Sequence, residues 1–143
     1  MTTKGRKSEL AYRKYRKQHK DDKTCVFCRI VPGHPEFIEE GKYFKLIVVL
    51  YSYQFWDEQD VEDQIMLVPK KHVESIRDLP LGAADEFLAY VGIYEEKGYS
   101  VYARAPGSAT KSQPHQHTHL IKTKGKRKRL IIYSKKPFML FMR

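Results

Sequence analysis

The stretch SQPHQHTHLIK, residues 112–122, decides how the rest of the chain is interpreted, because it places His115, His117 and His119 at every second position. In a β-strand, side chains at positions i, i+2 and i+4 point to the same face. On a helix each residue turns by about 100°, which would separate the three rings. The proline before the motif and the Thr, Leu and Ile residues around its end favour a strand. The sequence therefore predicts a β-strand that carries three imidazole rings on one face.

Three neighbouring imidazoles suit several kinds of chemistry. Histidine has an unperturbed pKa of about 6.5, so near neutral pH it can ligate a metal ion, bind phosphate, or act as a nucleophile or an acid. The alternative is that the three histidines are ordinary surface or hydrogen-bonded structural residues. We favour a functional site, because the titratable groups are clustered.

The length and the charge distribution predict one domain with basic ends. A chain of 143 residues can bury the core of a single domain. The net charge of +10 comes from the ends, since residues 1–24 carry nine Lys and Arg against three acids, and residues 122–143 carry nine against none. Such ends can bind polyphosphate or nucleic acid. Equally, KTKGKRKR at 122–129 is typical of a solvated loop between two strands.

No apolar segment of the sequence is long enough to cross a bilayer, and the N-terminus lacks the apolar stretch of a secretory signal. We therefore expect a soluble, cytoplasmic protein with no membrane partner.

The expected elements describe an α+β domain with a mainly antiparallel sheet and one main helix. Residues 1–23 form a basic N-terminal arm, helical over 8–19, with too little apolar surface for a core. The compact domain is expected over residues 24–143.

Within that domain, residues rich in β-branched and aromatic side chains predict strands, and one segment has helical periodicity. The acidic segment 56–64 is expected to separate two of the strands. Gly98 is placed to end the helix. The predicted strands are 43–55 (one long or two short), 65–70, 100–105, the histidine stretch, 129–136 and 137–143, and the helical repeat consists of Leu81, Ala84, Phe87, Leu88, Val91 and Tyr94.

Both cysteines, Cys25 and Cys28, form a CxxC pair in TCVFCRI. In a cytosolic protein such a pair is more often a metal knuckle or a redox pair than a disulfide, and no βαβ pattern surrounds it to indicate redox chemistry. Two thiolates make half of a tetrahedral zinc site, which two imidazoles elsewhere would complete. The candidates for these imidazoles are His34, His72 and the three histidines of the motif.

With CVFC, LVPKKHVESIRDL and SQPHQHTHL in this order, the chain resembles the histidine triad superfamily of nucleotide hydrolases and transferases, over roughly residues 24–122. The resemblance implies that the middle histidine, His117, attacks the α-phosphorus of a nucleotide and forms a nucleotidyl-histidine, which water or another acceptor resolves. It implies that His119 contacts the phosphate. A neutral imidazole is a good nucleophile and a tolerable leaving group, so the covalent intermediate divides one difficult displacement into two easier steps.

The resemblance also implies residues that bind the substrate. Ser112 and the adjacent Gln113 belong to a segment that binds phosphate or leaving group in relatives, and Arg104 lies in a region where relatives offer an asparagine to phosphate. SQPH is similar to the galactose-1-phosphate uridylyltransferase and diadenosine polyphosphate phosphorylase branch. The acidic residue that relatives direct at a ribose has no clear counterpart, and Asp57 is the one candidate.

In zinc-containing relatives, CxxC, a histidine in the position of His72 and the first histidine of the motif ligate zinc together. The resemblance therefore implies one structural Zn²⁺ bound by Cys25, Cys28, His72 and His115, and no organic cofactor. In this interpretation His115 holds the ion while the other two motif histidines face the phosphate.

The sequence thus predicts a hydrolase or nucleotidyl transferase that acts at the α-phosphate of a nucleoside phosphoramidate, a dinucleoside polyphosphate or an adenylated adduct. One alternative is a deadenylase of nucleic-acid ends of the aprataxin type, directed by the basic ends. A second is a non-catalytic nucleotide-binding or scaffold protein. A homodimer is expected through sheet edges, the main helix and the apolar stretches near the C-terminus.

Overall fold

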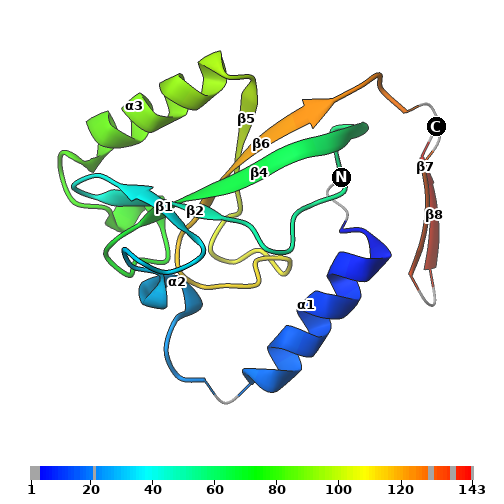
Figure 1. Cartoon of the computed structure of the whole chain (residues 1–143), viewed down its shortest axis with the longest axis horizontal. Helices are drawn as coiled ribbons and strands as arrows, with labels where there is room; N and C mark the ends of the chain where they lie inside the picture. The colour runs from blue at the N-terminus through cyan, green and yellow to red at the C-terminus, as the bar shows by residue number, and fades with distance from the viewer. Residues whose placement is uncertain (1–3, 21, 129–130, 136–137, 143) are drawn as a thin grey trace.

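A computed structural model describes residues 4–20, 22–128, 131–135 and 138–142. Its centre is an antiparallel sheet with the strand order β1–β2–β4–β6–β5, in which β3 pairs with β4 (Figure 1). This confirms the predicted α+β class with a mainly antiparallel sheet. The strands are β1 Phe37–Glu40, β2 Phe44–Val48, β3 Phe55–Trp56, β4 Gln59–Pro69, β5 Tyr99–Ala103 and β6 Thr118–Lys124.

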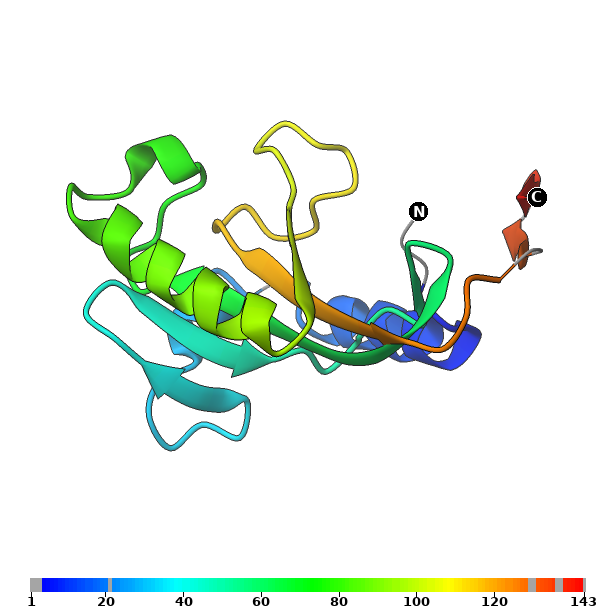
Figure 2. The same cartoon turned by 90° about the horizontal axis from the view of Figure 1, so that it is seen from above.

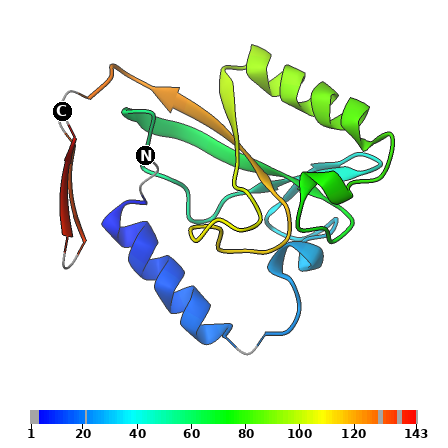
Figure 3. The same ribbon diagram turned by 180° about the vertical axis from the view of Figure 1, so that it is seen from behind.

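Helices lie on both sides of this sheet, with α3 on one side and α1 on the other, as Figures 1 and 3 show from opposite directions. Among the described residues, no helix has the length and apolar character needed to cross a bilayer. The helices are α1 Arg6–Gln18, α2 Val26–Arg29 and α3 Ala83–Glu96, with a short 3₁₀ helix at Ile76–Asp78.

Strand β4 separates two hydrophobic clusters, because its side chains alternate between the faces of the sheet. Ile65 and Leu67 belong to the cluster that packs against α3. Met66 and Val68 belong to the cluster that packs against α2, on the other face. Leu67 is fully buried, and burial of such a side chain contributes about 1.5–3 kcal/mol. Two packed faces therefore hold β4 and its neighbour β6 rigidly under the site.

The acidic segment 56–64 does not separate two strands, as was predicted, but forms a hairpin that runs into β4. Trp56 pairs with Gln59 across a two-residue turn. The turn residues Asp57 and Glu58 both have positive φ, 47° and 63°, as the favoured turn of a two-residue hairpin requires. The first half of β4 was not predicted as a strand, because its charged side chains lie at the surface and interrupt the apolar pattern.

The histidine strand begins later than predicted. β6 starts at Thr118, so His115 and His117 lie in the segment that leads into it. The ladder of β4 and β6 ends at the pair Leu67↔Thr118. Two residues beyond Leu67 lies Pro69, which has no N–H to donate to a neighbouring strand. Regular pairing therefore stops before it reaches the first two histidines.

Helix α3 is present and Gly98, with φ of 85°, follows its end. Its buried side differs from the predicted repeat, because Leu81 and Leu88 are 99% and 64% exposed. The residues that pack against the sheet are Ala83, Phe87, Tyr90 and Tyr94. Phe87 and Tyr94 belong to the predicted repeat, whereas Ala83 and the partly buried Tyr90 replace the two leucines.

The two last strands, β7 Ile131–Lys135 and β8 Phe138–Met142, pair with each other in a separate two-stranded sheet. Figure 2 shows this hairpin apart from the main sheet. The predicted dimer contact through these stretches falls on side chains outside the described part of the structure, so it stays a prediction.

Candidate active site and metal site

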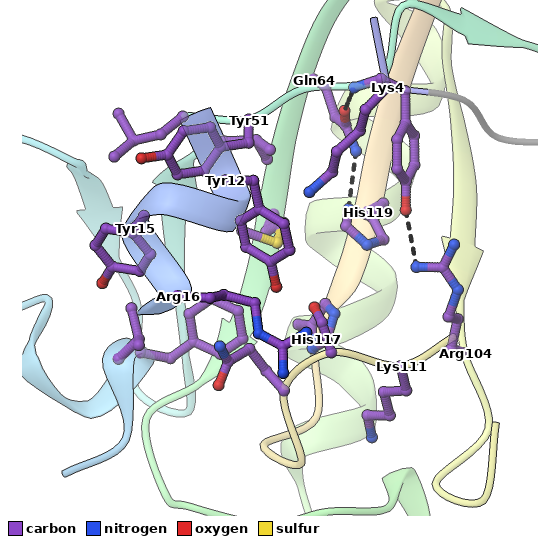
Figure 4. Close-up of a pocket in the computed structure, with 18 of the residues that line it drawn as sticks. Lys4, Tyr12, Tyr15, Arg16, Tyr51, Gln64, Arg104, Lys111, His117 and His119 are labelled. Carbon is purple, nitrogen blue, oxygen red and sulfur yellow. Dashed lines mark hydrogen bonds between the residues drawn. The ribbon is translucent and has the colours of Figure 1, made fainter. Parts of the chain in front are cut away.

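A cavity of about 570 Å³ opens on the face of the sheet that carries α2. His117 and His119 project into it from β6 and the segment before it, and α1 lies across it (Figure 4). Gln64 and Met66 of β4 also line it, because they lie on the same face as His119, whose strand partner is Met66. The alternation of β4 and β6 therefore directs polar groups of two strands into one cavity.

The protonation of His117 follows from its hydrogen bond. Its Nδ1 lies 2.8 Å from the carbonyl oxygen of His115. A carbonyl oxygen only accepts hydrogen bonds, so Nδ1 carries the proton and Nε2 has a free lone pair. Burial lowers the pKa of His117, against the opposing effect of this hydrogen bond. The ring is therefore neutral near pH 7, with its nucleophilic nitrogen available.

His119 is also neutral but is the opposite tautomer, because its Nδ1 faces a donor rather than an acceptor. The Gln64 side chain accepts a hydrogen bond from the Tyr53 backbone N–H through Oε1, at 2.7 Å, so its amide group faces His119 and donates to Nδ1 at 3.0 Å. The proton of His119 therefore resides on Nε2, and this buried nitrogen has no hydrogen-bond partner in the described part of the chain. Burial lowers the pKa of His119 to about 3. The ring is therefore neutral, and its Nε2–H can donate a hydrogen bond to a ligand in the cavity.

Cationic and polar groups from the segment between β5 and β6 form another wall of the cavity. Arg104, Lys111, Ser112 and Gln113 all line it. Arg104 donates to the hydroxyl of Tyr53 at 2.9 Å, which fixes its guanidinium on the side of His119 (Figure 4). The cavity thus combines a neutral nucleophile, a neutral donor and cations, a combination suited to an anionic phosphate group.

A second group of side chains lies beside the cavity. The ligand atoms of Cys25, Cys28, His72 and His115 all lie within 4.8 Å of one another. Nδ1 of His115 is 3.4 Å from the sulfur of Cys25 and 3.6 Å from that of Cys28, and Nδ1 of His72 is 3.4 Å from the latter sulfur. Zinc bonds of 2.0–2.3 Å in a tetrahedron would separate ligand atoms by about 3.3–3.8 Å. These residues fit a tetrahedral metal ion.

The hydrogen bonds around this group favour metal binding. Nε2 of His115 donates to the carbonyl oxygen of Pro69 at 3.0 Å, so Nδ1 keeps its lone pair toward the sulfurs. Burial holds the pKa of His115 down to about 4, so the ring is neutral. Such a carbonyl partner for the second nitrogen is typical of metal-ligating histidines. In addition, Lys45 is buried under α2 and donates to the carbonyls of Phe27 and Ile30 at 2.7 and 2.5 Å, which secures the CxxC turn.

Comparison with solved structures indicates the fold family. A protein described as "Hit Like Protein" superposes with a TM-score of 0.55 at 16% identity, over 71% of this chain and 100% of that one. A histidine triad protein from Clostridium difficile superposes with a TM-score of 0.50 at 24% identity, over 71% and 91%. No protein-family model matches the chain.

Comparison with characterised sequences agrees. Adenosine 5'-monophosphoramidase HNT1 of Saccharomyces cerevisiae is 30% identical over an alignment of 120 positions that covers 78% of this chain and 70% of that protein. The chain belongs to the histidine triad family. The protein of the same name from Candida albicans is 28% identical over 114 residues, 71% of each chain.

The histidine triad motif is divided between the two sites, because His115 belongs to the group of possible metal ligands and the other two histidines line the cavity. All the other site residues that the resemblance implies lie in one site or the other. Two further candidates named from the sequence, His34 and Asp57, lie in neither. Nδ1 of His34 accepts a hydrogen bond from the Glu36 backbone, and Asp57 occupies the β3–β4 turn rather than the cavity wall.

Several residues of this histidine triad protein were missed by sequence reasoning. Gln64 was assigned to a separating segment, although it orients His119. Lys4 and Tyr12 were assigned to an arm outside the domain, although they line the cavity. Lys45 was passed over within an apolar run. The basic character of residues 1–24, with tyrosines interleaved at 12–17, is the sequence signal for contact with phosphate or a partner.

Proposed function

We propose that this protein hydrolyses or transfers nucleotides at the α-phosphate through a covalent intermediate on His117. The observation that carries the proposal is the hydrogen bond from Nδ1 of His117 to the His115 carbonyl, which leaves Nε2 unprotonated beside an anion-binding wall. The candidate substrates are nucleoside phosphoramidates, dinucleoside polyphosphates and adenylated adducts. The names of the relatives, adenosine 5'-monophosphoramidases, support an adenine nucleotide.

In the first step the lone pair of His117 Nε2 attacks the α-phosphorus. A P–N bond forms, the bond from phosphorus to the leaving group breaks with its electron pair, and an amine leaving group takes up a proton. The attacking ring of His117 becomes positively charged, because both of its nitrogens now carry a substituent. The Nδ1–H to carbonyl hydrogen bond strengthens as that charge develops, which favours the intermediate.

In the second step water attacks the same phosphorus. The P–N bond breaks and its electron pair returns to Nε2, so that free nucleotide leaves and one proton is released. Transfer differs only in the acceptor, which replaces water. His119 donates from Nε2, and Arg104 supplies positive charge, to the phosphoryl oxygens in both steps. Ser112 and Gln113 lie at the same wall, where the leaving group would depart.

We propose that the metal ligands hold a structural zinc ion. An ion held by Cys25, Cys28, His72 and His115 would join the CxxC turn to the segment that carries the nucleophile, 90 residues further along the chain. It would contribute to stability and to the position of that segment. His117 follows two residues after His115, so the direction of its ring depends on the same backbone.

The substrate is proposed to be a small nucleotide rather than a nucleic-acid end. The basic stretch after β6 is paired with acids of the β3–β4 hairpin, Arg127 with Glu58 of the turn at 2.6 Å and Lys128 with Asp60 of β4 at 2.9 Å. These pairs reduce the positive charge that the stretch offers to a phosphate backbone.

The test is release of AMP from adenosine 5'-phosphoramidate and diadenosine tetraphosphate by the wild type and a His117→Asn variant. We expect the variant to be slower by roughly three orders of magnitude or more. A substrate labelled at the α-phosphate should leave label on the quenched wild type and none on the variant. Equal turnover by both proteins, or no release from either substrate by the wild type, would refute the proposal.

A further inference from the structure

We propose that the N-terminal segment completes the substrate pocket and that Lys4 binds the phosphates of an anionic leaving group. The protein would then prefer substrates in which the nucleotide is joined to further phosphate, such as dinucleoside polyphosphates, over those with an amine leaving group. This inference rests on the proposed function and assigns its substrate class.

Helix α1 presents one side to the cavity. Glu9, Tyr12 and Arg16 recur at helical spacing and line the cavity together with Tyr15. The rings of Tyr12 and Tyr15 pack against that of Tyr51, in the loop after β2, with centroids 5.4 and 5.9 Å apart. In Figure 4 these side chains lie opposite His117 and His119. The helix is therefore a wall of the pocket.

Lys4 is held at the phosphate end of this wall. Its ammonium lies 3.6 Å from the centre of the Tyr12 ring, a cation–π contact that orients the side chain. Figure 4 shows the side chain directed toward His119. Burial, with a contribution from Arg104, lowers the pKa of Lys4, although Glu9 opposes this. Two cationic side chains thus lie close together beside a buried imidazole.

Unsatisfied polar atoms in the same cavity indicate a ligand. Nε2 of His119 and the hydroxyl of Tyr12 are both buried, and neither has a hydrogen-bond partner among residues 4–20 and 22–128. A buried donor without a partner is costly. Phosphate oxygens between α1 and β6 would accept from both donors and would neutralise Lys4 and Arg104. An anionic ligand with several oxygen acceptors, such as a phosphate chain, meets both requirements at once.

The balance of charge favours more than one phosphate. Four cationic side chains line the cavity, Lys4, Arg16, Arg104 and Lys111, against two acids. One of these acids, Glu9, pairs with Arg13 at 3.0 Å. A single α-phosphate cannot balance this surplus, whereas a leaving group made of phosphate adds negative charge. An amine leaving group brings no negative charge and leaves the surplus uncompensated.

The experiment compares kcat/KM for diadenosine tetraphosphate and adenosine 5'-phosphoramidate in the wild type, Lys4→Met, Lys4→Arg and Lys14→Met. Lys14 is an exposed lysine of α1, the helix that follows Lys4, and does not line the cavity, so it is the matched control. We expect Lys4→Met to lower the ratio of the two values about tenfold or more, as loss of a charged hydrogen bond predicts. Lys4→Arg should restore most of the ratio, and the control should leave it unchanged.

If the wild type releases AMP from the phosphoramidate and Lys4→Met has the same ratio of the two kcat/KM values as the wild type, the inference is overturned and the proposed function stays intact. If the wild type cleaves neither substrate, the proposed function fails, and calorimetry with ATP still tests the site. Weaker ATP binding by Lys4→Met than by Lys14→Met would then support it. Equal binding by both variants would overturn it.

Discussion

Replacement of Gln64 by leucine tests whether this side chain sets the protonation of His119. Gln64 is 4% exposed and connects the Tyr53 backbone N–H to Nδ1 of His119, at 2.7 and 3.0 Å. Leucine has a similar volume but no polar atom. The substitution therefore leaves one buried donor and one buried acceptor unsatisfied without opening a large cavity.

Each unsatisfied group costs about 1–3 kcal/mol, and the greater apolar burial of leucine offsets about 1 kcal/mol. The expected net loss is about 3 kcal/mol, which for a domain of this size lowers Tm by roughly 10 °C. The loss of Nδ1's partner also allows the proton of His119 to move to Nδ1. AMP release should therefore fall even at temperatures where the variant is fully folded.

Gln64→Glu tests the protonation directly. Glutamate has the same shape as glutamine, but both oxygens of its carboxylate only accept hydrogen bonds. The oxygen that faces His119 should draw a proton onto Nδ1 of His119 and raise the pKa of the ring from about 3. Urea unfolding measures the stability of both variants, and NMR titration of the ring resonances measures the pKa. Gln54→Leu, at an exposed position of the preceding loop, is the control and should change stability by less than about 0.5 kcal/mol. A Gln64→Leu variant as stable as this control, or an unshifted His119 titration in Gln64→Glu, would refute the reasoning.

Three further predictions concern the metal site, α3 and acid stability. Wild-type protein prepared without chelator should contain one zinc per chain by elemental analysis, and Cys28→Ser should contain less and melt at a lower temperature; an equal zinc content in both would contradict the ligand assignment. The carboxylate of Glu86 accepts from three backbone N–H groups before and in β2, at 2.9–3.1 Å, so Glu86→Ala should cost about 2–3 kcal/mol in chemical unfolding, and a loss within error would show that the turn does not depend on it. The pKa of His119 is about 3 in the folded protein and 6.5 in the unfolded chain, so between these pH values only the unfolded state binds the extra proton. The free energy of unfolding should therefore fall as the pH decreases below about 6.5, by up to about 1.4 kcal/mol per pH unit. This dependence on pH, measured by chemical unfolding, should be weaker in His119→Asn.

The chemistry of the sites could be predicted from the sequence to a large extent. The residue types and their order indicated two thiolates and several imidazoles as possible metal ligands. The structure brings the side chains of CxxC, the histidine of LVPKKH and the first of the alternate histidines together. The α+β class followed from local periodicity, and α3 followed from helical spacing. These features are local, because side-chain type and backbone preference act over a few residues.

The relations between distant segments could not be predicted in this way. Gln64 and His119 meet because β4 and β6 pair with a register that puts Met66 opposite His119. No pattern within either strand determines that register. The hairpin at 56–64 and the packing of Tyr90 in α3 were missed for a related reason, because polar and aromatic residues take a buried or surface position according to what packs on them.

By itself, the sequence determined which reactive groups this protein possesses, the order in which they occur and the type of most elements, since those depend on residue chemistry and short-range backbone preference. Only the tertiary structure decided which nitrogen of each triad histidine is free, because that depends on carbonyl and amide partners such as His115, Pro69 and Gln64. It also decided that the basic N-terminal segment forms a wall of the pocket. Hydrogen bonds and packing between segments far apart in the chain have no local sequence pattern. These contacts orient the histidine rings and determine which nitrogen of each ring faces the cavity.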